Sequence, residues 1–431
     1  MRKSAYMFCL SFFMLTVAAG CSDGVEESKE DATVNGKWTG AIDVPNQQLD
    51  IIVKLTKDNE WSGTISIPVQ GIKDYPLSAV TVDGNDIAFF MELQGQQISF
   101  DGELKKDVIE GNFSQHGQTF PFSLTKGGPV DENDKNFLSV ETNEGTLYGE
   151  VEKPDGKGPF PVMLIIPGSG PTDRNGNSNG VQGDNNSLKM LAESLAEYGV
   201  ASVRYDKRGA GKNLEAAIPE NELRFDQFVD DAVKWTDSLA QEDDFSKVGI
   251  IGHSQGSLVG MLAAQKGQAD VFISLAGAGR SIDQVLYDQL ESQLSGNLLQ
   301  EAMSILEKLK QGERIENVSQ ELQGAFRPSV QGFIASWMQY DPAEEITELE
   351  VPVLIAGGGR DLQVPANEAE LLYEAQPNAN KLILEKMNHV LKEAPADEEG
   401  NKATYSDPEL PLADGLMEGI IDFLKENEFM K

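Results

Sequence analysis

The chain has 431 residues, of which 40% are hydrophobic and 7% aromatic, so it can bury substantial cores and is not intrinsically disordered. This length exceeds that of a typical single domain, and two domains are expected. The formal net charge of −35 argues against nucleic-acid binding, because recognition of phosphates requires a basic surface.

Residues 1–20 have the pattern of an export signal. Arg2 and Lys3 precede an apolar stretch that is short for a membrane span and runs into AAGCSDG. Small residues before Cys21 resemble the lipobox of bacterial lipoproteins, although Ala18 stands where leucine is usual. We therefore expect cleavage before Cys21, a lipid anchor on this cysteine, and export to the outer face of a membrane of the bacterial cell envelope. Ordinary secretion and a short anchor helix are the alternatives.

Residues 36–126 are expected to form a small antiparallel β-barrel or sandwich. The preceding residues 21–35 are acidic and nearly free of large apolar side chains, which is typical of a solvated tether. Short segments rich in β-branched and aromatic residues, such as LDIIVKLT and DIAFFMEL, alternate with turn pairs. They predict about seven or eight strands. Residues 127–135, GGPVDENDK, form the linker to the next domain.

In residues 136–431 strands alternate with helices, which predicts an α/β domain. The apolar run PFPVMLIIPG is typical of a strand buried on both faces, and SLKMLAESLAEYG is typical of an amphipathic helix that ends at a glycine. Repeated βαβ units of this kind predict a mostly parallel sheet with helices on both faces. The helix-rich residues 280–340 interrupt the repeat and are expected to form a cap.

Two serines lie in a Gly-x-Ser-x-Gly pattern, and their contexts differ. Ser254, in GHSQG, follows the predicted strand KVGIIGH and precedes the predicted helix GSLVGMLAAQ. This strand–turn–helix setting is that of a nucleophile elbow, in which flanking glycines permit the tight turn. Ser178, in GNSNG, lies in a polar loop with neither element beside it. We therefore predict that Ser254 is a nucleophile and that Ser178 is not.

A serine nucleophile needs a base that a carboxylate orients, and the chain offers three histidines. His116 belongs to the β domain, and the side chain of His253 is expected to point away from that of its neighbour Ser254. His389, which follows the last predicted strand, is therefore the predicted base. Asp361, at the end of the preceding strand, is the expected carboxylate, and Glu385 is its rival.

The oxyanion of an acyl-transfer intermediate needs backbone N–H donors placed in advance. One is expected from Gln255, at the start of the helix after the nucleophile. The other is expected from Ser169 in the loop IIPGSGPTDRNG, with Gly170 as the second choice.

Residues 137–431 resemble the α/β-hydrolases of the serine-esterase and serine-aminopeptidase-like branch, including bacterial two-domain carboxylesterases with a β-rich N-terminal domain. The stretches PGSGPTDRNG, YDKRGAGKN, GHSQG and VPVLIAGGGRDLQVP, followed by an Asn-His pair, carry the resemblance. It implies an α/β-hydrolase fold and a triad of Ser254, Asp361 and His389. The chain departs from the family where Pro167 and Gly168 replace the usual His-Gly before the oxyanion residue.

The sequence thus predicts a serine hydrolase that acts on small-molecule carboxylic esters with short acyl chains through an acyl-enzyme. An aminopeptidase or thioesterase on the same fold is the first alternative, with acidic residues of the cap segment EKLKQGERIEN as candidates for binding an ammonium group. A surface-binding lipoprotein without catalysis is the second. No cofactor is expected. No metal is expected either, because the three histidines are scattered. Contact with a membrane is expected only through the anchor on Cys21.

Overall fold

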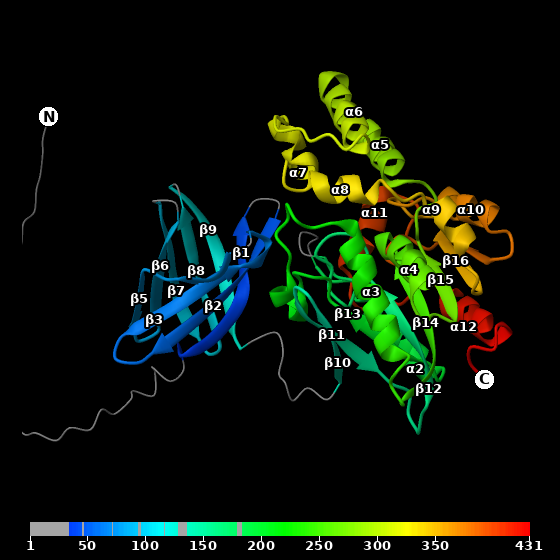
Figure 1. Cartoon of the computed structure of the whole chain (residues 1–431), viewed down its shortest axis with the longest axis horizontal. Coiled ribbons are helices and arrows are strands. Elements are labelled where there is room, and N and C mark those ends of the chain that lie inside the picture. Colours follow the sequence, from blue (N-terminus) through cyan, green and yellow to red (C-terminus); the bar gives the residue numbers. More distant parts are fainter. Residues whose placement is uncertain are drawn as a thin grey trace, which may run out of the picture.

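We analysed a computed structural model, which describes residues 34–44, 47–70, 72–93, 96–115, 117–127, 136–178 and 183–431. Two units lie side by side, an all-β domain and a larger α/β domain with a helical cap (Figure 1). The predicted export signal, Cys21, most of the linker and His116 lie outside the described residues. No helix within the described ranges is long and apolar enough to cross a membrane.

The β domain is one antiparallel sheet of nine strands, in the order β4-β3-β2-β1-β9-β8-β7-β6-β5, that curves into a half-barrel. Alternate side chains of its strands point into one core, where Phe100 packs against Phe89, Phe113 and Phe122. The strands are β1 (Gly36–Val44), β2 (Gln47–Lys57), β3 (Trp61–Ile67), β4 (Ile72–Pro76), β5 (Ala79–Asp83), β6 (Asp86–Leu93), β7 (Gln96–Lys105), β8 (Val108–Gln115) and β9 (Gln118–Lys126), with the short helix η1 (Pro68–Gln70).

The prediction of about seven or eight strands was too low. The two shortest strands of this sheet are β4 and β5, which form its two edges. None of their side chains is fully buried. Edge strands of this kind have weak apolar alternation, and Pro76 at the end of β4 is tolerated there because an edge needs fewer ladder hydrogen bonds.

The α/β domain contains an eight-stranded sheet in the order β10-β11-β13-β12-β14-β15-β16-β17. The hairpin β10–β11 pairs antiparallel at one edge, and the other strands are parallel. The predicted fold class is therefore confirmed. The strands are β10 (Phe137–Thr142), β11 (Gly145–Glu152), β12 (Phe160–Ile166), β13 (Ala201–Tyr205), β14 (Phe245–His253), β15 (Val271–Leu275), β16 (Val353–Gly358) and β17 (Asn380–Leu384).

Helices cover both faces of this sheet, which explains the unbroken apolar run of β12. Val162, Leu164 and Ile166 face a core with α3 and α4, whereas Met163 and Ile165 face a core with α2 and α12. The helices outside the cap are α2 (Ser187–Glu197), η2 (Gly211–Ala216), α3 (Phe225–Leu239), α4 (Gln255–Lys266), α9 (Pro342–Glu345), η4 (Ile346–Glu348), α10 (Ala366–Ala375), α11 (Glu398–Ala403), η5 (Thr404–Ser406) and α12 (Leu416–Glu426).

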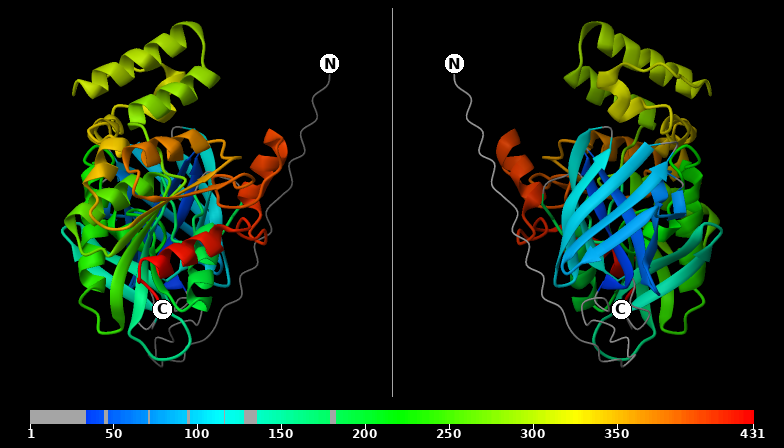
Figure 2. Two further views of the ribbon diagram at one scale, coloured as in Figure 1. Left: turned by 90° about the vertical axis from the view of Figure 1, so that its right-hand side faces the viewer. Right: turned by 90° about the vertical axis from the view of Figure 1, so that its left-hand side faces the viewer.

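The cap projects above the sheet and has its own hydrophobic core (Figure 2). At its base, Arg280 donates through Nε to Glu368 of α10 at 2.8 Å. On its lower side, Trp337 stacks on Phe225 of α3 with ring centroids 5.5 Å apart. The cap helices are α5 (Ile282–Gln293), α6 (Gly296–Lys310), η3 (Gln320–Leu322), α7 (Gln323–Phe326) and α8 (Gln331–Trp337).

The β domain contacts the α/β domain along β1, β2 and η1. Lys37 of β1 forms an ion pair with Glu215 of η2, and η1 packs near η2. A cavity of about 560 Å³ lies between the two units and is lined by Ile52, Pro68 and Ile72 from one side and by Ala217 and Pro219 from the other, together with charged side chains. The contact is therefore mixed in character, with apolar and ionic parts.

Because the α/β domain rests on these contacts, we expect a chain that begins at Asn136 to keep its fold but to melt several degrees lower than the full chain. Thermal unfolding followed by circular dichroism measures this difference. Lys37→Glu in the full chain should also lower the melting temperature, by less than the truncation does. Adding Glu215→Lys should restore part of this loss. Identical melting of the truncated and full chains would show that the β domain is an independent module.

Candidate active site

Ser254 lies at a sharp turn between β14 and α4, with φ 55° and ψ −122°. Such a backbone conformation is rare for a residue with a side chain and is maintained only where the surroundings hold it. The Ser254 N–H donates to the carbonyl of Leu275 on the adjacent strand at 2.9 Å. The turn therefore presents the Ser254 hydroxyl at the carboxyl edge of the sheet.

The two glycines around Ser254 are required by close backbone approach. A Cβ atom on Gly256 would lie 2.4 Å from the carbonyl oxygen of Ile166, at the end of β12. A Cβ atom on Gly252 would lie 2.2 Å from the carbonyl oxygen of Gly256. Both distances are far below van der Waals contact, so the Gly-x-Ser-x-Gly pattern at 252–256 has a packing cause as well as a conformational one.

His389, Asp361 and Ser254 form one hydrogen-bonded chain. His389 Nε2 lies 3.1 Å from Ser254 Oγ, and His389 Nδ1 lies 2.8 Å from Asp361 Oδ2. The three residues follow β14, β16 and β17, whose carboxyl ends meet at the same edge of the sheet. In this arrangement the imidazole can accept the hydroxyl proton while the carboxylate fixes its orientation.

The carboxylate and the imidazole are each fixed by their own loops. Asp361 Oδ1 accepts from the N–H groups of Gln363 and Val364, both at 2.8 Å. Glu385, the rival carboxylate, makes no such contact with His389. Beside His389, the buried Asn388 side chain donates to Thr404 Oγ1 at 2.6 Å, which anchors the loop. Both members of the pair are thus held before any substrate arrives.

His253 does not point away from the site, contrary to the sequence-based expectation. Its buried ring lies 5.0 Å from that of His389, and its Nε2 is 2.7 Å from the carbonyl oxygen of His389. Burial, and next the neighbouring His389, lowers the pKa of His253 to about 4. The ring is therefore neutral at pH 7 and donates its Nε2–H to the His389 backbone.

Ser169, Ser254 and Gln255 line one cavity of about 180 Å³ beneath the cap. Gln255 is the first residue of α4, so its N–H has no partner within the helix. Gly168 packs directly against the nucleophile, because a Cβ atom on it would lie 3.2 Å from Ser254 Cβ. Gly170, the second choice for a donor, is not among the lining residues. The rest of the wall consists of Leu258, Ala278, Arg280, Ile282, Val285, Leu286, Gln289, Trp337, Pro342, Gln363 and Val364.

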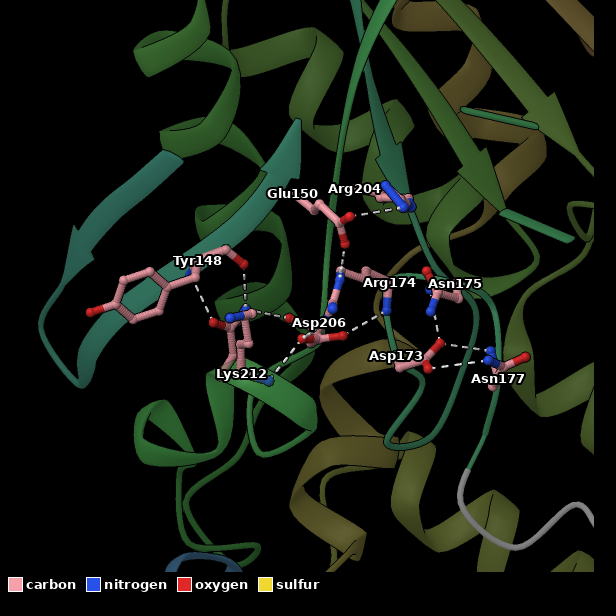
Figure 3. Close-up of polar contacts among 10 residues, drawn as sticks. Tyr148, Glu150, Asp173, Arg174, Asn175, Asn177, Arg204, Asp206 and Lys212 are labelled. Carbon is pink, nitrogen blue, oxygen red and sulfur yellow. Dashed lines mark hydrogen bonds and ion pairs between the residues drawn. The ribbon is translucent and has the colours of Figure 1, made fainter. Parts of the chain in front are cut away.

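A buried ionic network supports the loop that carries Ser169 (Figure 3). Arg174 donates to Asp206 Oδ2 at 2.8 Å and to Glu150 Oε2 at 2.5 Å, and Arg204 lies 3.3 Å from Glu150 Oε1. The Arg174 N–H also donates to Asp206 Oδ1 at 2.8 Å. Asp206 therefore ties the loop after β12 to the loop after β13. This is a structural role for the YDKRGAGKN stretch.

Ser178 makes no hydrogen bond to Ser254, His389 or Asp361 in the described part of the chain. Its hydroxyl is 2.8 Å from that of Thr172, within the loop that Asp173 and Asn177 brace by further hydrogen bonds (Figure 3). Within the described ranges, no group of three or more His, Cys, Asp or Glu side chains is placed to hold a metal ion.

Comparisons with known proteins find relatives of the α/β domain. Residues 178–392 match the family model described as serine aminopeptidase, S33. Esterase EstD of Thermotoga maritima is 30% identical over 263 residues, which are 60% of this chain. The chain has an α/β-hydrolase-like fold and is similar to the serine aminopeptidase S33 family over residues 178–392. It spans 61% of the length of that curated relative.

Solved esterase structures are similar to this chain. Est1E from Butyrivibrio proteoclasticus is 18% identical, with a TM-score of 0.45, and the match covers 69% of this chain and 100% of that one. The Pyrococcus furiosus esterase Pf2001 is 14% identical, with a TM-score of 0.42, and the match covers 67% of this chain and 91% of that one.

Sequence reasoning missed two residues near the candidate site. His253 was set aside because it adjoins the serine, although its place at the end of a buried strand was a signal that its ring is enclosed. Lys207 lies in the stretch YDKRGAGKN, which served only as part of the family resemblance. Its side chain is buried and reaches the loop beside Ser254.

Replacing His253 with alanine should leave the buried carbonyl of His389 without a donor and cost about 1–3 kcal/mol of unfolding free energy. His253→Gln, which keeps a donor, should lose less. In wild type the folded ring stays neutral while the unfolded ring titrates near its ordinary pKa, so stability should fall as the pH drops from about 6.5 toward 4. Urea unfolding at several pH values measures this part of the pH dependence, which both variants should lack.

Proposed function

We propose that the chain is a serine hydrolase that cleaves carboxylic esters with short acyl chains through an acyl-enzyme. The hydrogen-bonded chain from Ser254 Oγ through His389 to Asp361 is the observation that carries this proposal. The esterase relative of Thermotoga maritima supports ester hydrolysis as the reaction.

In the proposed reaction, His389 Nε2 takes the proton of Ser254 as Oγ attacks the ester carbonyl. Asp361 holds the imidazole through Nδ1 and stabilises the imidazolium. The tetrahedral oxyanion accepts hydrogen bonds from the N–H groups of Gln255 and Ser169. His389 then returns the proton to the departing alcohol. Water, deprotonated by His389, attacks the acyl-enzyme and releases the carboxylic acid.

The cavity above Ser254 supports short acyl groups. Its volume of about 180 Å³ is below the range of about 300–1,000 Å³ that is typical of sites for drug-sized ligands. Apolar side chains of α5, namely Val285 and Leu286, and Trp337 of α8 form part of its wall. A long acyl chain would need space that these side chains occupy.

The lining does not favour an aminopeptidase. An exopeptidase needs a carboxylate to bind the substrate's ammonium group, and none of the residues that line the cavity in the described chain is acidic. The cap segment EKLKQGERIEN contributes Glu307 and Lys310 to a different surface, on the outer side of α5 and α6. A thioesterase needs no such carboxylate, and assays with acyl thioesters distinguish it from an esterase.

We further propose that this enzyme is exported and lipid-anchored through Cys21. The sequence pattern of residues 1–21 supports this assignment. A location outside the cytoplasm also suits a hydrolase of small esters, because it would meet substrates that arrive from the surroundings.

Ser254→Ala should lower ester hydrolysis at least about a thousand-fold, and His389→Ala should be similarly damaging, because members of such a triad act as a unit. The rate of p-nitrophenyl butyrate hydrolysis measures both losses. Ser178→Ala is the matched control and should retain most of the activity. A fluorophosphonate probe should label wild type and Ser178→Ala but not Ser254→Ala; equal losses in the two serine variants would contradict the assignment.

Butyrate esters should exceed palmitate esters in kcat/KM by at least about 100-fold, because each excluded methylene removes binding energy from the transition state. Trp337→Ala should enlarge the cavity and reduce this ratio about tenfold. Met303→Ala, an exposed position on α6 outside the cavity, is the control. Comparable kcat/KM values for the two esters in wild type would contradict the proposed preference.

A further inference from the structure

Lys207 is a buried lysine with two hydrogen-bond acceptors and no carboxylate partner. It follows β13 and is only 6% exposed. Its ammonium group donates to the carbonyl oxygen of Gly168 at 3.0 Å and to Gln255 Oε1 at 2.7 Å. It also lies 4.2 Å from the ring centroid of Phe228. Among the described residues, no Asp or Glu lies within ion-pair distance of it.

A buried cation without a counter-charge is costly, because the ammonium loses its hydration. The charged groups next to Lys207 do not compensate for this loss. Asp206 binds Arg174, and Arg208 binds Asp231 of α3. The imidazole of His253, on the other side of Gly168, is neutral at pH 7. Packing alone would be served at lower cost by an apolar side chain, so the buried amine and its two hydrogen bonds point to another role.

Each acceptor of Lys207 is covalently linked to one of the two proposed oxyanion donors, the N–H groups of Ser169 and Gln255. The carbonyl of Gly168 and the N–H of Ser169 are parts of one planar peptide group. A hydrogen bond donated to the carbonyl oxygen fixes that plane and strengthens the N–H as a donor through polarisation. Gln255 supplies the other N–H, and its side-chain oxygen binds the same ammonium group.

The Gln255 side chain depends on this contact for its position. Its Nε2 is buried and has no hydrogen-bond partner among the described residues. The amide is therefore held through Oε1 by Lys207. Without the lysine, the residue that begins α4 would lose this anchor, and so would the Gly168–Ser169 peptide.

We infer that Lys207 is a positioning residue of the oxyanion hole, which aligns and polarises both backbone donors through Gly168 and Gln255 and places a positive charge behind the developing oxyanion. This inference rests on the proposed function. Lys207 acts through Gly168 and Gln255 and does not itself contact the substrate.

The protonation state of Lys207 should also affect how kcat/KM depends on pH. Burial lowers the pKa of Lys207 to about 7. Since kcat/KM reports ionisations of the free enzyme, its pH profile should decline above this pKa as the positive charge is lost.

The test compares Lys207→Met with wild type and with Lys212→Met, which removes a lysine charge from the same loop. Removal of one oxyanion donor costs about 100- to 1,000-fold in kcat, so misalignment of two donors should cost about 10- to 100-fold. We expect this loss in kcat for p-nitrophenyl butyrate, with KM within about twofold. The affinity for an alkylboronic acid, which forms a tetrahedral adduct on the serine, should fall by the same factor. Lys212→Met should change none of these values.

Rates are normalised to the fraction of enzyme that a fluorophosphonate labels, so that loss of folded protein does not count as loss of catalysis. Wild-type kcat and boronate affinity in Lys207→Met would overturn the inference. If that variant does not fold, the wild-type profile decides, because a flat kcat/KM between pH 7 and 9 overturns the inference as well. Lys207→Arg, which stays charged, should lack the alkaline decline. Retained hydrolysis in Ser254→Ala would instead refute the proposed function itself.

Discussion

The left-handed backbone of Ser254 is the constraint on which the arrangement of the site depends. The turn exists because the start of α4 packs against the end of β12 so closely that Gly256 can carry no side chain. The adjacent strand β15 holds the turn from the other side through the carbonyl of Leu275. Three parallel strands thus hold the strained backbone of Ser254 in place. These strands are themselves fixed by the hydrophobic cores on the two faces of the sheet.

Three consecutive residues after β13 connect this turn to its surroundings. Asp206 binds Arg174 in the loop before α2, Lys207 binds Gly168 and Gln255, and Arg208 binds Asp231 of α3. The three charged side chains thus bind three different segments of the chain. A single short segment therefore connects the loop after β12 with α4 and α3.

Much of the α/β domain could be predicted because strong local patterns coincide with its structure. The apolar run of β12 and the glycine pattern around Ser254 can be recognised in the local sequence, although the close approach that requires Gly256 involves the distant Ile166. The placement of Asp361 and His389 followed from one rule, that the carboxyl ends of parallel strands meet. The geometry agrees with the choice of Asp361 over Glu385, since it is Asp361 that contacts His389.

The features that escaped prediction depend on tertiary contacts. The edge strands β4 and β5 are polar enough to be taken for loops, and the hairpin β10–β11 lies before the regular βαβ pattern begins. The orientation of His253 is set by the His389 loop, which is 136 residues away in sequence. The burial of Lys207 likewise depends on segments that precede and follow it, and no local pattern distinguishes it from an exposed lysine.

The construction of the cap has an evolutionary consequence. Its core is a separate cluster from the two cores of the sheet. It is joined to the domain below through Arg280 at one end and through Phe333 and Trp337, which pack on α3, at the other. The ion pair of Arg327 with Glu220 is a further connection. Residues of α5 line the cavity beside Ser254, whereas Ser254, Asp361 and His389 lie in turns that follow strands of the sheet. Mutations in α5 can therefore change the wall of this cavity while the three residues keep their spacing. Divergence of specificity within one ancestral scaffold requires no change in the elements that perform the chemistry.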